Sequence, residues 1–97
     1  MRCEIILSPE AVNDLRRLPA GLRSAVREAM ERHLRYEPTH LSKSRIKRLR
    51  GLSRPQYRLR VDEFRVFYDV NGNRVEVLAV VSKADVDGWL REQETEL

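Results

Sequence analysis

The segment from Tyr57 to Val70 constrains the fold more than any other part of the sequence. Within residues 57–62 and 64–70, every second side chain is apolar and the positions between are mostly charged. Such alternation places successive side chains on opposite faces of a sheet. Asp62 and Glu63 separate the two runs and indicate a two-residue loop, although neither is the glycine that such turns favour. The segment is therefore predicted to form an antiparallel β-hairpin.

The register of this hairpin brings arginines together. A two-residue loop sets Arg60 directly across from Arg65, and Arg58 lies two residues from Arg60 on the same face. Directly opposed like charges destabilise a sheet by up to roughly 1 kcal/mol per pair. One interpretation is a cationic face that binds a polyanion. The other is a solvated face on which long side chains splay apart, and the hairpin alone leaves both open.

Basic residues are concentrated in one stretch of the chain. Residues 38–61 contain eight Lys or Arg and no acidic residue, whereas the rest of the chain holds eleven basic and fifteen acidic residues. The whole positive excess therefore lies in this stretch, which favours a nucleic-acid partner. The candidate nucleic-acid contacts that precede the hairpin are Lys43, Arg45, Lys47, Arg48, Arg50 and Arg54.

The residues before the hairpin predict one strand and two helices. An apolar strand over residues 4–7 is followed by Ser8, a good helix N-cap, and by Pro9, which suits the first helical position. This first helix ends at Pro19, and an apolar stripe predicts a second helix over residues 20–36. The two helices form a helical hairpin that must cover an apolar surface.

The residues after the hairpin predict a third strand and a final helix. Asn71-Gly72-Asn73 is a strong turn signal, because Asn and Gly tolerate positive φ. A strand over 74–81 follows, apolar on both faces from Leu78 onward. A helix from about Ala84 has an apolar side formed by Val86, Trp89 and Leu90.

These elements predict an α+β fold in a single domain, residues 1–97. We expect a small antiparallel sheet, made of a three-stranded meander plus the N-terminal strand, with the helical hairpin on one face and a short C-terminal helix. The partner of the first strand is open. Residues 45–51 are compatible with a short helical turn or with an irregular strand.

The sequence lacks the common catalytic and cofactor motifs. It contains no P-loop, GxGxxG, HExxH or CxxC pattern, and Cys3 is its only cysteine, so no cofactor or metal is expected. His33 lies at the edge of an apolar helical stripe and is read as structural, whereas His40 is a weaker candidate for phosphate contact or proton transfer. With no signal peptide and no apolar run of about eighteen residues, we expect a soluble, cytoplasmic protein without a membrane partner.

Several segments together resemble the RelE/ParE superfamily of toxin–antitoxin toxins. They are Arg48-Leu49-Arg50-Gly51, Tyr57–Val61, Phe64–Val70, Val75–Val81 and the helix start at Ser8. The resemblance covers nearly the whole chain and implies a toxin neutralised by a small cognate antitoxin. RelE-like members are ribosome-dependent mRNA endoribonucleases (mRNA interferases), and ParE-like members inhibit DNA gyrase without catalysis. The RelE-like function is the leading hypothesis; a basic nucleic-acid-binding module without toxicity is a further alternative.

The resemblance to RelE-like ribonucleases also implies site residues. The basic pair of the family's second strand corresponds to Arg58 and Arg60, the arginine of the third strand to Arg65, and the basic residue after the last strand to Lys83. These four are the candidate catalytic residues. Ala84 stands where the ribonucleases often have another Arg, and no Tyr or His follows residue 68, so acid–base groups are scarce while the phosphate-binding groups are present.

The C-terminal segment is predicted to cover the basic face. Residues 82–97 contain five acidic residues against Lys83 and Arg91. The helical hairpin can cover only one face of the sheet, so the final helix should cover the other, with its acids near the arginines and held partly by charge. An antitoxin with an acidic amphipathic helix would then displace it and bury the same face. For residues 92–97 alone, a frayed, solvated tail is the favoured alternative.

Overall fold

The computed structural model describes residues 2–95, so Glu96, one of the acids predicted to shield the basic face, lies outside the described residues. Five strands form one sheet in the order β1-β5-β4-β3-β2. β1 pairs in parallel with β5, and the other neighbours are antiparallel. The strands are β1 (Glu4–Leu7), β2 (Ile46–Arg48), β3 (Tyr57–Val61), β4 (Phe64–Asn71) and β5 (Arg74–Ser82).

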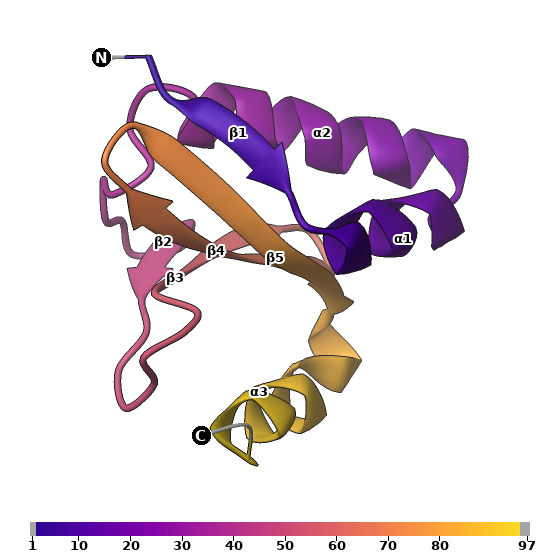
Figure 1. Cartoon of the computed structure of the whole chain (residues 1–97). Coiled ribbons are helices and arrows are strands. Elements are labelled where there is room, and N and C mark those ends of the chain that lie inside the picture. The colour runs from indigo at the N-terminus through magenta and orange to yellow at the C-terminus, as the bar shows by residue number, and fades with distance from the viewer. Residues whose placement is uncertain (1, 96–97) are drawn as a thin grey trace.

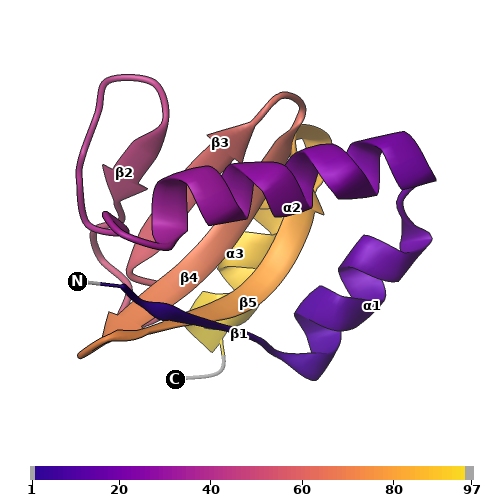
Figure 2. The same ribbon diagram turned by 90° about the horizontal axis from the view of Figure 1, so that it is seen from above.

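The helices lie on opposite sides of this sheet. α1 (Pro9–Arg17) and α2 (Ala20–Leu34) lie on one side, and α3 (Val86–Thr95) lies on the other after a 3-10 turn over Lys83–Asp85 (Figures 1 and 2). None of the helices in the described part of the chain is both long enough and apolar enough to cross a membrane. The predicted α+β arrangement is therefore confirmed.

Ser8 fixes the entry to α1 as the sequence predicts. Its Oγ accepts a hydrogen bond from the backbone N–H of Ala11 at 3.0 Å and donates one to the carbonyl oxygen of Leu78 at 2.8 Å. The N-cap residue therefore satisfies an orphan helix donor and ties α1 to β5.

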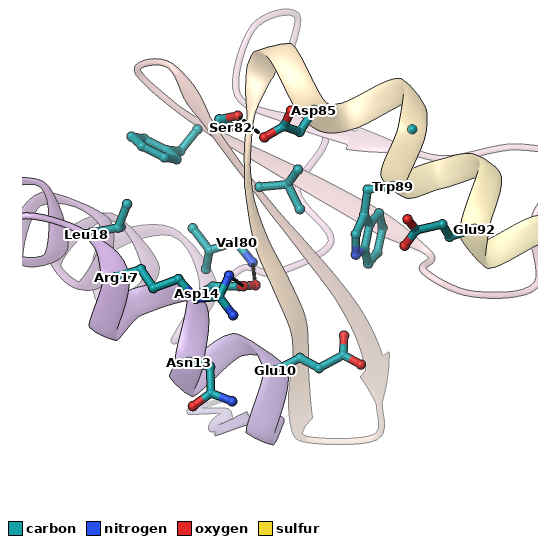
Figure 3. Close-up of a pocket in the computed structure, with 13 residues that line it drawn as sticks. Glu10, Asn13, Asp14, Arg17, Leu18, Val80, Ser82, Asp85, Trp89 and Glu92 are labelled. Atoms are coloured by element: carbon teal, nitrogen blue, oxygen red, sulfur yellow. Dashed lines mark hydrogen bonds and ion pairs between the residues drawn. The ribbon is translucent and has the colours of Figure 1, made fainter.

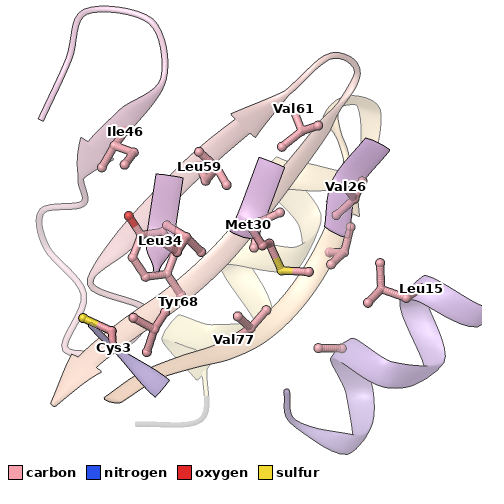
Figure 4. Packing of buried hydrophobic residues seen from close by; sticks show 14 residues of the cluster. Cys3, Leu15, Val26, Met30, Leu34, Ile46, Leu59, Val61, Tyr68 and Val77 are labelled. Carbon is pink, nitrogen blue, oxygen red and sulfur yellow. The ribbon is translucent and has the colours of Figure 1, made fainter. Parts of the chain in front are cut away.

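The larger apolar cluster lies between the sheet and the helices α1 and α2. We call this side of the sheet the core face. The Tyr68 hydroxyl reaches through the cluster to donate to the carbonyl oxygen of Pro38 at 2.6 Å. Removing these side chains from water is the main stabilising contribution to the fold. Figure 4 shows the cluster, which includes Leu15, Val26, Met30, Leu34, Leu59, Tyr68 and Val77.

A smaller apolar cluster lies on the opposite side of the sheet, under α3. Phe67, Ala79 and Val81 are buried there, and Val86, Trp89 and Leu90 pack against them. The rings of Phe67 and Trp89 stack with centroids 4.6 Å apart. The predicted covering of both sheet faces near the end of β5 is therefore confirmed.

Three details differ from the sequence prediction or complete it. The sheet is mixed, because β1 runs parallel to β5, and this also answers which strand it pairs with. The segment over residues 45–51 contributes a three-residue edge strand, β2. The second helix ends at Leu34, two residues earlier than predicted, and Leu22 of its expected apolar stripe is 39% exposed.

Candidate nucleic-acid interface

The register of the β3–β4 hairpin places three arginines on one surface. Arg60 pairs directly with Arg65, and Arg58 pairs with Phe67, so all four side chains share a face of the sheet. Asp62 in the loop adopts φ of 50°, which supplies the left-handed conformation that such a turn needs without a glycine. We call Arg58, Arg60 and Arg65 the arginine triad.

The edge strand β2 adds further positive charge to the same surface. Lys47 pairs with Arg58, and the backbone N–H of Arg60 donates to the carbonyl oxygen of Arg45 at 2.8 Å. Arg45 and Arg60, with Ser44 and Asp62, line a hollow of about 220 Å³. The cationic surface therefore extends from the triad to the edge of the sheet.

Arg65 is the most buried member of the triad, with 9% of its surface exposed. Its guanidinium donates to the carbonyl oxygens of Asp62 and Phe64, each at 2.9 Å. These bonds turn the side chain back toward its own hairpin loop. Arg65 therefore holds the loop and supplies a fixed positive charge beneath its neighbours.

Arg58 carries an unsatisfied donor. Its Nε is buried and has no hydrogen-bond partner among the described residues. Burial first, and then the charges of Arg65 and Arg60, lower the pKa of the Arg58 guanidinium, which nevertheless stays protonated near neutral pH. A buried donor without a partner costs free energy.

The triad lacks acidic partners in the structure. Within residues 2–95, no carboxylate lies within 4.0 Å of a charged nitrogen of Arg58, Arg60 or Arg65. The cover that α3 provides is apolar, through Trp89 on Phe67. We expect acids of the final helix to lie near the arginines, but among the described residues none of them forms an ion pair with the triad. Asp85 accepts a hydrogen bond from the Ser82 hydroxyl at 2.9 Å.

Lys83, the fourth candidate catalytic residue, lies at the same end of the sheet as the hairpin loop. Its backbone N–H donates to the carbonyl oxygen of Glu63 at 2.7 Å, and the preceding Ser82 pairs with Phe64. The Lys83 side chain is exposed. The fold thus brings the start of the C-terminal segment beside the loop that carries Arg65.

The other candidate nucleic-acid contacts divide into two groups. Arg54 makes an ion pair with the buried carboxylate of Asp69 at 2.7 Å, and Arg48 lies over the ring of Tyr57 while donating to the carbonyl oxygen of Gln56. These two arginines hold the loop before β3. Lys43 and Arg50 are exposed in the segments that flank β2.

Groups that could exchange a proton near neutral pH lie away from the triad. Tyr57 and Tyr68 stack on each other on the core face, with centroids 5.5 Å apart, and burial raises the pKa of Tyr68 further. His33, His40 and the remaining tyrosine line a separate pocket beside α2. Lys83, whose backbone lies beside the hairpin loop, stays the sequence-predicted candidate for proton transfer.

A second hollow, of about 700 Å³, separates α1 from α3 and has the opposite character. Glu10 and Asp14 line it from α1, Asp85 and Glu92 from the C-terminal segment, and Trp89 presents its ring to it (Figure 3). Asp14 also accepts from the backbone N–H of Val80 at 2.9 Å. This hollow is mainly acidic, so the sequence-predicted phosphate-binding residues and this cavity are distinct features.

The open sheet carries the arginine triad on one face and has helices on both sides, so the chain is a small α+β protein. A sequence model of the ParE toxin of type II toxin–antitoxin systems (parDE) matches residues 5–86. The chain belongs to this family, within the RelE/ParE superfamily, and is a toxin of a type II toxin–antitoxin system. The matched segment contains the triad and Lys83 and ends at Val86, where α3 begins.

Three solved structures with a similar fold come from toxin–antitoxin complexes. The chain is similar to one in the RelBE2 complex of Mycobacterium tuberculosis, with TM-score 0.71 and 24% identity over 84% of this chain and 99% of that one. It is also similar to a chain of the RelE–RelB complex of Pyrococcus horikoshii OT3, with TM-score 0.70 and 26% identity over 86% of this chain and 97% of that one. A chain of the RelB–RelE complex of Methanococcus jannaschii is similar with TM-score 0.65 and 20% identity over 87% of this chain and 96% of that one. The comparison with curated proteins gave no match.

Proposed function

We propose that this toxin inhibits translation in the cytoplasm by binding mRNA on the ribosome through the arginine triad, and that it cleaves the mRNA there. The observation that supports the proposal best is the triad itself. Three guanidinium groups share one face without an acidic partner in residues 2–95, and one of them has a buried, unsatisfied N–H. A phosphodiester supplies the missing charge and acceptors, and the planar fork of arginine matches its oxygens.

The triad suits the charge that develops during RNA cleavage. The 2′-hydroxyl oxygen attacks the adjacent phosphorus, the bond to the 5′-oxygen breaks, and a 2′,3′-cyclic phosphate and a 5′-hydroxyl result. Arg58 and Arg60 stabilise the charge on the phosphorus-bound oxygens, and Arg65 adds a fixed positive field beneath them. The Lys83 ammonium is the candidate donor to the leaving oxygen, while the proton of the 2′-hydroxyl passes to solvent.

Cleavage is expected to require the ribosome. The face supplies cations but few acid–base groups, so a free RNA would have to find the reactive geometry unaided. We also propose a cognate antitoxin as the protein partner, because the structural neighbours are complexes of toxins with antitoxins.

Inhibition of DNA gyrase without catalysis is the second candidate function. Two observations favour it: the matching family model is that of ParE, and both histidines and all tyrosines of the chain lie away from the triad. Under this hypothesis the cationic surface recognises gyrase or its DNA, and no RNA is cut.

The experiment has three assays. The protein is incubated with programmed ribosomes, with the same mRNA free in solution, and with DNA gyrase in a supercoiling reaction. We expect new mRNA 5′ ends only with ribosomes, and loss of the cuts in Arg60→Ala. Arg27→Ala, which removes one exposed arginine of α2, is the charge-matched control and should cut normally. Efficient cutting of free mRNA would refute the ribosome requirement. Inhibited gyrase with uncut mRNA would replace the proposal with the second candidate.

A further inference from the structure

Both histidines of the chain line one pocket at the C-terminal end of α2. The pocket has a volume of about 260 Å³ and lies between α2 and the loop that leads into β2. The chain has only two histidines, and they lie seven positions apart, one on a helix and one on a loop. Neither the family assignment nor the proposed chemistry of the triad accounts for two histidines that line one pocket. The polar side chains that we consider are Arg32, His33, Tyr36, His40, Ser42 and Arg45, which we call the histidine pocket.

The groups of this pocket are mostly hydrogen-bond donors. Arg32 and Arg45 can only donate, and Glu37 is the single carboxylate in the lining. The Ser42 Oγ accepts from the backbone N–H groups of Arg45 and Ile46, at 3.0 and 3.2 Å. Its lone pairs are thereby engaged, so its hydroxyl hydrogen is directed elsewhere. Arg32 also lies 3.9 Å from the carboxylate of Glu28, but both side chains are exposed and such a pair is weak. A donor-rich pocket lined by two arginines and one carboxylate is suited to an anion.

Arg45 connects the histidine pocket to the arginine triad. It lines this pocket and also, with Arg60, the hollow of about 220 Å³ on the triad's face. The backbone bond from Arg60 to Arg45 fixes the two strands at this point. Arg45 therefore joins the hollow beside Arg60 to the pocket that Arg32 lines, and Asp62 and Glu37 are the acidic residues of the two linings. Basic groups spread over two adjoining hollows match the successive phosphates of a nucleic-acid strand better than a single small ion.

We propose that the histidine pocket binds a phosphate group of single-stranded RNA, adjacent along the strand to the phosphate held by the triad. This inference rests on the proposed function, since it extends the RNA path of that function around the sheet edge. The pocket adds affinity and direction to the bound strand and takes no part in bond cleavage. Phosphate contacts of this kind orient a nucleic acid without reading its sequence.

The pocket also makes RNA binding depend on pH. Burial first, and then the charges of Arg45 and Arg32, lower the pKa of His33 in the free protein. A bound phosphate reverses the effect of those charges and favours the imidazolium form. The titratable groups around His33 are Arg32 and Tyr36 of α2, Glu37 and His40 of the loop, and Arg45 before β2. RNA affinity should therefore rise as the pH falls from 8 to 6.

Histidine side-chain NMR tests this inference directly, because the two imidazoles report on this pocket alone. The probes are inorganic phosphate and a short single-stranded RNA with 2′-O-methyl riboses, which cannot be cleaved. We expect the RNA to shift both imidazole signals and to raise the pKa of His33. His40→Gln, an exposed change, and His33→Gln should each weaken RNA binding several-fold at pH 6, and His33→Gln should also flatten its pH dependence.

The variant set separates failure of the pocket from failure of the proposed function. If Arg60→Ala abolishes RNA binding while the imidazoles do not respond, the pocket inference is overturned and the proposed function stands. If the wild-type protein does not bind the free RNA, the pocket inference is overturned, and the assay with programmed ribosomes alone decides the proposed function. A response to inorganic phosphate without one to RNA would identify an isolated phosphate site and overturn the RNA inference. Thermal melts check that the variants remain folded. If His33→Gln does not fold, His40→Gln alone still tests the pocket.

Discussion

The two faces of one five-stranded sheet are built to different ends. On the core face, side chains such as Leu59, Val66 and Tyr68 are fully buried beneath α1 and α2. On the opposite face, Phe67 lies under Trp89 while its neighbours Arg58 and Arg65 hold uncompensated charge. Because β3 and β4 supply both faces through alternating residues, stability and the candidate function are encoded in the same ten or so positions. We therefore expect residues kept for function to lower the stability of the protein on the arginine-bearing face and not on the core face.

The largest effect should come from matched leucine truncations on the two sides. Leu59→Ala on the core face should lower the free energy of unfolding by about 3 kcal/mol, because the site is fully buried. Leu90→Ala on α3, which is partly buried, should cost about 1 kcal/mol. Urea denaturation measures both. Equal losses would mean that α3 is packed as tightly as the main core, against the contrast drawn above.

Asp69 should contribute almost as much, although it is polar. Its carboxylate accepts from the Arg54 Nε at 2.7 Å and from the backbone N–H of Gln56 at 2.8 Å, and Asp69 is only 7% exposed. Asp69→Asn should lose about 2 kcal/mol, since hydrogen bonds to a charged partner are worth more than neutral ones. The exposed change Asp87→Asn is the control and should alter stability by less than about 0.5 kcal/mol. A loss of similar size in both variants would argue against the loop tether.

Within the triad, Arg65→Ala and Arg60→Ala should differ in stability and agree in function. Arg65→Ala removes the bonds to two loop carbonyls and should cost about 1 kcal/mol. The simple argument from opposed charges predicts no loss for either variant, and the structure revises it for Arg65. Arg60 is exposed, and Arg60→Ala should leave stability unchanged or slightly raised. Growth inhibition on induced expression should disappear in both, and persistence in Arg60→Ala would exclude the triad.

Arg58→Met should stabilise the protein slightly. The charged Arg58 side chain, which has an unsatisfied buried donor, is replaced by an apolar side chain of similar length. The free energy of unfolding should rise by up to about 1 kcal/mol. Inorganic phosphate should raise the melting temperature of the wild type and have less effect on Arg58→Met. A lower melting temperature in Arg58→Met would show that the guanidinium stabilises the fold.

The smallest effect concerns the stability of the histidine pocket against acid. Because the pKa of His33 is lowered in the folded protein, the unfolded chain binds more protons between the folded and unfolded pKa values. Stability that is present above the unfolded pKa should decrease as the pH falls through this window. Melting temperatures between pH 7.5 and 5 should decline less in His33→Gln than in the wild type. If melting temperature falls equally with pH in both proteins, protonation of His33 does not cause the decline.

Local patterns in the sequence predicted the hairpin best. Alternation over residues 57–70 and the two-residue loop were enough to predict the pairing of Arg60 with Arg65, because side-chain period and loop length together fix a register. The N-cap at Ser8 was predictable for the same reason: its partner, Ala11, lies three residues away. Such features depend on neighbours in the chain.

Features that depend on distant segments could not be predicted. The pairing of β1 with β5 joins residues about seventy positions apart, and nothing in either strand specifies its direction. Arg54 looked like a free cation because Asp69, fifteen residues away, reaches it only after β3 and β4 have paired. The placement of His33 and His40 around one pocket likewise depends on how the loop folds back beside α2. Sequence reasoning counted charges correctly and could not tell which of them the fold would neutralise.

The stacking of Trp89 on Phe67 has a practical consequence. Trp89 is the only tryptophan in the chain, and its ring lies on the residue that pairs across strands with Arg58. Intrinsic fluorescence excited at the indole band therefore comes from a single position, at the seam between α3 and the arginine-bearing surface. Any ligand, antitoxin or nucleic acid that lifts or tightens α3 will change the emission wavelength or its quenching. The unmodified protein thus carries its own optical probe of the surface that matters most.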